Sequence, residues 1–179
     1  MRELVEAIQN ALPTPGMPVT VVAVDGHGGS GKSTLAAKLA KELNAEIIHT
    51  DDFAGWDNPK NWWPNLRDTV LTPMKHGAKT LNYQPSSWAP DHHPEPVKDQ
   101  PVTSIVILEG VGSSRKEFRP YLSYAVWVDT PKDVCIARGI ERDGEGMRDQ
   151  WEEWWASEEE YIAEHQPQEY ANQVVSGVS

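Results

Sequence analysis

The fold is decided by residues 26–33, Gly26-His27-Gly28-Gly29-Ser30-Gly31-Lys32-Ser33, which satisfy the pattern Gly-x₄-Gly-Lys-Ser/Thr. An unbroken apolar run, VTVVAVD at 19–25, precedes them and predicts a strand buried on both faces. A leucine stripe over 32–43 predicts the helix that follows. A glycine-rich loop between such a strand and helix curls its N–H groups inward at the positive end of the helix dipole. The stretch therefore predicts a phosphate-binding loop.

Each part of the loop has an expected task. Lys32 supplies a mobile charge for the β- and γ-phosphates, and the Ser33 hydroxyl ligates Mg²⁺. The rest of the cradle is backbone from Gly26, Gly28, Gly29, Ser30 and Gly31.

A dinucleotide-binding enzyme is the rival interpretation. Gly26, Gly28 and Gly31 also fit Gly-x-Gly-x-x-Gly, and Asp51 lies where such a fold places its ribose-binding acid. The Lys-Ser pair directly after the last glycine argues against it, because a triphosphate needs those side chains and a diphosphate does not.

Bulk properties narrow the class of protein. The 179 residues are 39% hydrophobic and 24% charged, as expected for one globular domain, and no apolar run reaches the roughly 20 residues of a membrane span. A single cysteine indicates a cytoplasmic protein without disulfides, and the histidines show no zinc-ligand spacing. The net charge of −11 disfavours nucleic acid and membrane partners.

Strand-like and helix-like segments alternate along the chain. Helices are expected at 2–12, 32–43, 114–120, 131–142 and 147–165, and strands at 19–25, 45–50, 102–108, 124–128 and 174–178. The alternation predicts a three-layer α/β domain with a parallel sheet. We expect one domain over 1–179.

Residues 51–101 differ from the rest, being rich in tryptophan and proline. A helix over 66–76, kinked or ended near Pro73, is expected there, and otherwise irregular structure. Such an insertion fits either a cover over a site or a small satellite core.

Acidic residues follow two expected strands. Asp51, at the end of strand 45–50, is placed to take a proton from an attacking hydroxyl, and Glu109 to hold Mg²⁺ through water. Asp52 would face substrate or solvent. Helix capping and exposed strand ends are the alternatives for these acids.

Arg138 and Arg142 lie four apart on one expected helix face, with Arg148 beyond. Paired guanidiniums clamp a transferring phosphoryl group, although salt bridges with Glu141, Asp143 or Glu145 would explain them too. The acidic run 141–169 is interpreted as a solvated helix face.

The segments DGHGGSGKST, HTDDF, ILEG and RGIERD, in this order, resemble the uridine kinase family of P-loop kinases. The family also contains nicotinamide riboside kinase, pantothenate kinase and phosphoribulokinase relatives. The resemblance implies a five-stranded parallel sheet with the strand of Glu109 beside the loop strand, and a mobile arginine-bearing lid over about 138–150. It implies Asp51 as base, Glu109 as second acid, and further contacts from Lys32, Ser33, Thr34, Arg138, Arg142 and Arg148.

The acceptor-binding segment of uridine kinases is not recognisable. Residues 81–88, LNYQPSSW, resemble a tyrosine-to-tryptophan segment of bacterial uridine-kinase-like proteins, with Ser87 where an aspartate is usual. The acceptor-side candidates are Asp52 and four aromatic residues that line a pocket or pack a lid, Phe53, Trp56, Tyr83 and Trp88. His92-His93 is not expected to bind metal.

The sequence thus predicts a cytoplasmic small-molecule kinase that uses ATP and Mg²⁺ to phosphorylate a hydroxyl of a nucleoside or similar small polar metabolite. A P-loop ATP-binding protein without transfer activity and, with less support, a dinucleotide-binding oxidoreductase are the alternatives. The oligomeric state is left open.

Overall fold

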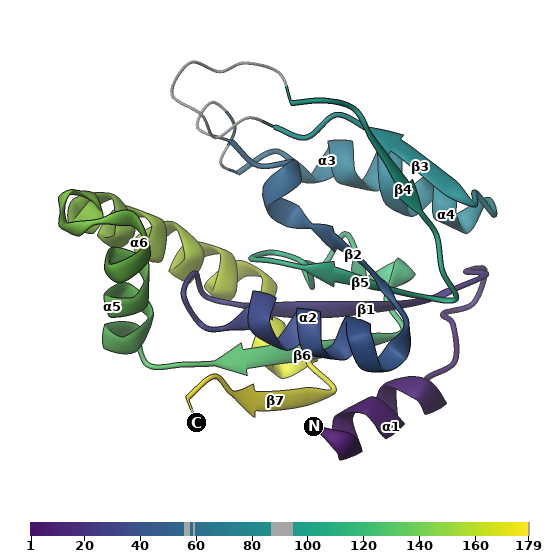
Figure 1. Ribbon diagram of the computed structural model, residues 1–179, viewed down its shortest axis with the longest axis horizontal. Coiled ribbons are helices and arrows are strands. Elements are labelled where there is room, and N and C mark those ends of the chain that lie inside the picture. Colours follow the sequence, from purple (N-terminus) through teal and green to yellow (C-terminus); the bar gives the residue numbers. More distant parts are fainter. Residues whose placement is uncertain (56–57, 59, 87–94, 179) are drawn as a thin grey trace.

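A five-stranded parallel sheet forms the centre of the protein (Figure 1), seen in a computed structural model that describes all residues except 56–57, 59, 87–94 and 179. The strand order is β2-β5-β1-β6-β7. The strands are β1 (Thr20–Gly26), β2 (Glu46–His49), β5 (Ile105–Glu109), β6 (Tyr124–Asp129) and β7 (Gln173–Ser176). Every residue of β1 is buried, as its unbroken apolar run predicts. The expected sheet is confirmed, and β5, which carries Glu109, lies beside the loop strand β1.

The strand order contradicts the dinucleotide interpretation. In the common dinucleotide-binding sheet the first two strands of the βαβ unit are neighbours. Here β5 lies between β1 and β2, and both pairings are parallel and in continuous register. The motif Gly-x-Gly-x-x-Gly is therefore incidental to the phosphate loop.

One face of the sheet is covered by the two helices that come before and after β1 in the sequence. The helices α1 (Arg2–Asn10) and α2 (Lys32–Leu43) bury Ile8 and Leu39 against Val22, Val24 and other sheet residues. A separate pair, α5 (Lys132–Asp143) and α6 (Arg148–His165), packs together at one end of the sheet, and the short α7 (Pro167–Tyr170) follows. Gly139 makes this pairing possible, because a Cβ there would lie 2.3 Å from the Trp151 ring.

The other face is covered by the insertion. Its helical segment consists of α3 (Trp63–Leu66), a π-helical turn η2 (Arg67–Leu71) and α4 (Thr72–Lys75). Leu66, Val70 and Met74 from this segment are buried with strand residues such as Val106. The segment passes Pro73 without ending there. The π-turn directly before it shifts the hydrogen-bond register, which accommodates a residue that lacks an N–H.

The expectation of irregular structure in the rest of the insertion was wrong for residues 80–83 and 98–101. An antiparallel hairpin joins β3 (Thr80–Tyr83) to β4 (Lys98–Pro101). β3 alternates exposed and buried residues, with Leu81 and Tyr83 inward, but β4 reads KDQP and has no apolar side chain to reveal it. Strand β5 accordingly begins at Ile105, three residues later than expected.

The part of the chain that the structure describes also contains three short 3₁₀ turns: η1 (Thr50–Asp52), η3 (Arg119–Tyr121) and η4 (Glu145–Met147). The expected helix at 114–120 is mostly turns followed by η3. Among the described residues, no helix is long and apolar enough to cross a membrane.

Candidate active site

The phosphate loop connects the buried end of β1 to α2. Gly26, Gly29 and Gly31 have φ of 150°, 76° and 100°, a region that other residues rarely adopt. At Gly29 space is also limiting, because a Cβ would lie 2.4 Å from the carbonyl oxygen of Cys135. Backbone geometry therefore explains the two glycines that the pattern requires, Gly26 and Gly31, and both backbone geometry and close packing explain Gly29.

Lys32 and Ser33 occupy the first turn of α2. Lys32 is buried, and its Nζ donates a hydrogen bond to the carbonyl of His27 at 2.6 Å, inside the loop. Ser33 is exposed, and its hydroxyl donates to Oε1 of Glu109 at 3.0 Å. The two residues predicted to hold Mg²⁺ thus lie next to each other, although they are 76 positions apart in the sequence.

Glu109 ends β5 and is buried. Its second oxygen lies 2.5 Å from Nδ1 of His49, at the end of β2. Burial acts to raise the pKa of Glu109, but the bonds from His49 and Ser33 and the charge of Lys32 outweigh it, so the pKa lies below its ordinary value. The carboxylate is therefore held ionised. Sequence reasoning missed His49, although its place at a strand end beside Asp51 was the available signal.

Asp51 follows β2 in the turn η1, at the same edge of the sheet. Desolvation by the surrounding protein raises its pKa, although the side chain still reaches solvent, and the charge of Glu109 acts in the same direction. The charges of Lys32, His49 and Arg142 act to lower it. A carboxyl that shares its surroundings with a lysine, an arginine and a second acid is the arrangement that candidate catalytic groups show.

Asp52 is turned to the hairpin. Its Oδ2 accepts hydrogen bonds from Lys98 Nζ at 2.8 Å and from the Tyr83 hydroxyl at 3.2 Å. Phe53 is buried in the core and packs against the Tyr83 ring, 4.9 Å between centroids. The predicted substrate contacts of these three residues stay predictions. Trp56, Trp88, Ser87 and His92-His93 lie outside the described residues.

Arg138 and Arg142 project from α5 toward different parts of the site. Arg138 donates to the carbonyls of Gly29 at 3.3 Å and Gly177 at 3.0 Å, so it ties α5 to the phosphate loop. Arg142 forms two hydrogen bonds with Asp143 and lies over the Trp151 ring. Its charge nevertheless acts to lower the pKa of Asp51. The salt bridge offered as the alternative for Arg142 is present.

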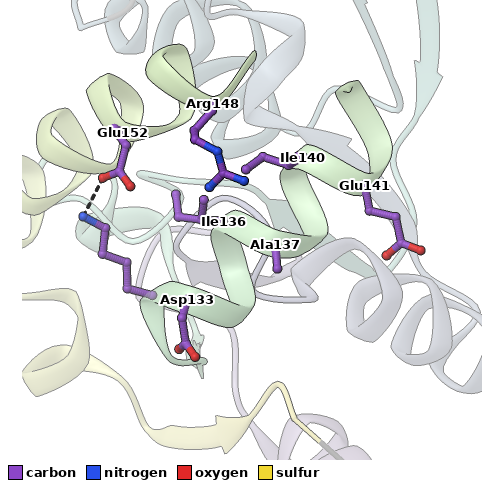
Figure 2. Close-up of a pocket in the computed structure, with 8 residues that line it drawn as sticks. Asp133, Ile136, Ala137, Ile140, Glu141, Arg148 and Glu152 are labelled. Carbon is purple, nitrogen blue, oxygen red and sulfur yellow. Dashed lines mark ion pairs between the residues drawn. The ribbon is translucent and has the colours of Figure 1, made fainter. Parts of the chain in front are cut away.

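Arg148 lies away from the phosphate loop. It extends from the start of α6 into a cavity of about 740 Å³ between α5 and α6, where it lies beside Ile136 and Ile140 (Figure 2). Its guanidinium pairs with Glu145 at 2.7 Å. The structure therefore brings Arg138 to the phosphate loop but not Arg148, whose nucleotide contact stays a prediction.

The acidic run 141–169 is only in part a solvated face. Its contacts with the phosphate loop were not predicted from the sequence. Glu158 and Trp155 of α6 contact His27 and Gly28 of the phosphate loop. Tyr161 donates to Oδ2 of Asp25 at 2.6 Å. Asp25 also accepts bonds from the N–H groups of Gly26, Gly112 and Ser114 and from the Ser114 hydroxyl. The spacing of Trp151, Trp155 and Glu158 along one helix face was the available signal.

Comparisons with known proteins point in one direction. No family model matches the chain. It is 27% identical to the uridine kinase of Proteus mirabilis over 146 residues, which span 69% of this chain and 68% of that protein. It is also 26% identical to the uridine kinase of Pasteurella multocida over 145 residues, or 69% and 67% of the two chains.

Solved structures share the fold. A possible uridine kinase from Bacillus stearothermophilus aligns with a TM-score of 0.71 at 20% identity, covering 97% of this chain and 95% of that one. A sugar kinase from Janibacter sp. aligns with a TM-score of 0.54 at 18% identity, covering 90% and 87%. The three-layer P-loop architecture is therefore common to this chain and to kinases that are only distantly similar in sequence.

Proposed function

We propose that this chain transfers the γ-phosphoryl group of ATP to a hydroxyl of a nucleoside or similar small polar metabolite. The proposal starts from its similarity to the uridine kinase-like P-loop kinases, which are phosphotransferases with a hydroxyl acceptor. The observation that carries the proposal is the meeting of Lys32, Ser33, Asp51 and Glu109 at the carboxyl ends of β1, β2 and β5. Ligands bind at this edge of open α/β sheets.

Binding of the donor rests on the loop. The inward N–H groups and the start of α2 hold the phosphates, and Lys32 adds a charge for the β- and γ-phosphates. The Lys32 ammonium has three donors, so it can donate to a phosphate oxygen while it keeps its hydrogen bond to the His27 carbonyl. In a protein of net charge −11 these local positive features are what attract an anionic nucleotide.

The residues present fit Mg²⁺. Ser33 and Glu109 offer oxygen ligands side by side, and the described residues contain no cluster of three or more histidine, cysteine or acidic side chains that would form an all-protein cage. Magnesium in kinases is held by one or two protein ligands with substrate phosphates. When bound, it neutralises charge on the β- and γ-oxygens.

Asp51 is the proposed base. It lies beside the groups that hold the phosphates, where it can orient the acceptor hydroxyl and accept its proton as the oxygen attacks phosphorus. A pKa raised toward the working pH makes a carboxylate a stronger base. Arg138 and Arg142 neutralise charge on the transferring group, and closure of α5 and α6 over it would exclude water.

The test is ADP release from MgATP against a panel of nucleosides, nicotinamide riboside, pantothenate, sugars and amino alcohols. We expect release that depends on one acceptor class and falls at least ~10²-fold in Asp51→Asn, as for loss of a general base. Asp52→Asn is the comparison variant: because its carboxylate bonds to the hairpin, we expect it to change KM for the acceptor but not kcat. If Asp52→Asn showed the loss instead, the base would be assigned to the wrong aspartate. Binding of ATP without release for any acceptor would favour the ATP-binding protein without transfer activity.

A further inference from the structure

The His27 ring is held on several sides by α6. It stacks on Trp155 with 3.7 Å between ring centroids and 9° between planes. Its Nδ1 lies 2.9 Å from Oε2 of Glu158, and its Nε2 lies 3.0 Å from Oε1 of Glu159. Trp127 of β6 meets it edge-on at 5.9 Å. Only about 9% of the side chain is exposed. A loop position that the Gly-x₄-Gly-Lys-Ser pattern leaves free is thus fixed by another part of the chain.

Glu158 holds the backbone of the loop as well as the His27 side chain. The same oxygen that contacts His27 Nδ1 accepts a hydrogen bond from the N–H of Gly28 at 3.0 Å. The side chain is about 15% exposed. Hydrogen bonds to a charged acceptor at low exposure are stronger than ordinary ones. One carboxylate therefore orients two successive residues of the loop.

The consequence reaches Lys32, because the carbonyl of His27 accepts the hydrogen bond from Lys32 Nζ. Fixing the ring and the following N–H fixes the peptide plane that carries this carbonyl. We propose that Glu158 and His27 are positioning residues for the phosphate loop: α6 sets the direction of the His27–Gly28 peptide, and through it the place of Lys32. The proposal rests on the proposed function, since it concerns the loop's grip on a nucleotide.

The arrangement also connects the loop to the arginine-bearing helix. Trp151, one turn before Trp155 on α6, packs on Gly139 of α5 and approaches Gly28. Arg138 of α5 bonds to the carbonyl of Gly29. Glu158 and Arg138 thus hold adjacent loop residues from two helices that contact each other, so that a shift of the helix pair would change the loop.

The experiment measures the dissociation constant of MgADP by calorimetry for the full-length wild type, Glu158→Ala and Glu158→Gln, with thermal unfolding in parallel. A glutamine whose oxygen takes the place of Oε2 can accept from both the Gly28 N–H and the His27 Nδ1–H, so it preserves the geometry without the charge. We expect Glu158→Ala to bind roughly tenfold more weakly, and Glu158→Gln to bind within about twofold of wild type. Glu153→Ala, an exposed residue of the same helix, is the matched control and should not change binding.

Two results would overturn the proposal. An unchanged dissociation constant in Glu158→Ala, with or without a lower unfolding temperature, would leave Glu158 a purely structural role. Tighter binding in both Glu158 variants would show that the carboxylate competes with phosphate. If Glu158→Ala does not fold, Trp155→Leu removes the stacked ring and is expected to weaken binding similarly.

Lys32→Ala separates this proposal from the proposed function. If Lys32→Ala and the wild type bind MgADP equally, nucleotide binding at the loop is itself refuted. If Lys32→Ala loses binding while Glu158→Ala does not, only the positioning role fails.

Discussion

The two sides of the site, the phosphate loop at 26–33 and the insertion at 51–101, are built differently. The loop is fixed by backbone: three glycines with positive φ, a helix that begins at Lys32, and carbonyls and N–H groups bonded to Arg138 and Glu158. Within the insertion the contacts are made by side chains, chiefly those of Asp52 with Lys98 and Tyr83 on the hairpin. In the proposed function the loop meets the triphosphate, which is the same in every kinase, and the insertion meets the acceptor, which differs between kinases.

The largest effect on activity is expected for Lys32→Ala in the phosphate loop. We expect transfer to fall ~10³-fold or more, because a charge aimed at the β- and γ-phosphates is lost from a site that has few others. Initial rates of ADP release measure it, with Lys38→Ala, an exposed lysine of the same helix, as control. Equal rates for both variants would contradict the assignment of the loop.

The pH dependence of transfer sharpens the role assigned to Asp51. The base must be ionised, so activity is lost as pH falls through the Asp51 pKa, and this acid limb should lie above the ordinary value of 3.8 because desolvation raises the pKa. A profile of kcat against pH measures it. A limb at or below the ordinary value would point to a different group.

The same shift has a consequence for stability. Because the folded protein disfavours the ionised form of Asp51, the penalty is present above the folded pKa and vanishes below the unfolded one. Asp51→Asn should therefore unfold at a higher temperature than wild type at neutral pH, with the gap narrowing as pH falls. A lower unfolding temperature at neutral pH would show that Asp51 is stabilising.

Alanine substitutions at one glycine in each region would compare how tightly the two regions are packed. Gly29 in the loop and Gly77 in the insertion have φ of 76° and 84°, but a Cβ at Gly77 would meet nothing within 4 Å. Gly77→Ala should cost about 1 kcal/mol of unfolding free energy, from backbone strain alone. Gly29→Ala adds a collision with the Cys135 carbonyl and should cost clearly more. Urea unfolding of both variants tests this, and equal costs would mean that the loop relaxes freely.

The smallest effect is expected on the acceptor side. Lys98→Met removes a partly exposed ion pair with Asp52, so the unfolding free energy should change by less than about 1 kcal/mol. The dissociation constant of MgADP should stay the same while KM for the acceptor rises a few-fold. Lys79→Met, exposed on the same hairpin segment, is the control. An effect on MgADP binding alone would contradict the division between the two sides.

Prediction from sequence worked where local chemistry permits few solutions. The helix 32–43, the strand at 19–25 and the acids at two strand ends followed from an apolar run, a glycine pattern and a sheet edge. It failed for the hairpin, because KDQP has no strand pattern and becomes a strand only by pairing with β3. It also failed for Glu158, because the acidic run 141–169 was interpreted as a solvated face although Glu158 lies on the same helix face as Trp151 and Trp155.

A phosphate-binding loop in an α/β sheet could be predicted from consecutive residues alone, because glycines with positive φ and a lysine at a helix start leave a recognisable pattern. The tertiary structure brings the distant contacts of the site together: His49 lies against Glu109, α6 packs on His27, and Arg138 bonds to the loop. It places Arg148 away from the loop. The physical reason is that these contacts join residues 60 to more than 130 positions apart. Their geometry is set by how strands and helices pack, whereas a local pattern indicates at most which residues are candidates.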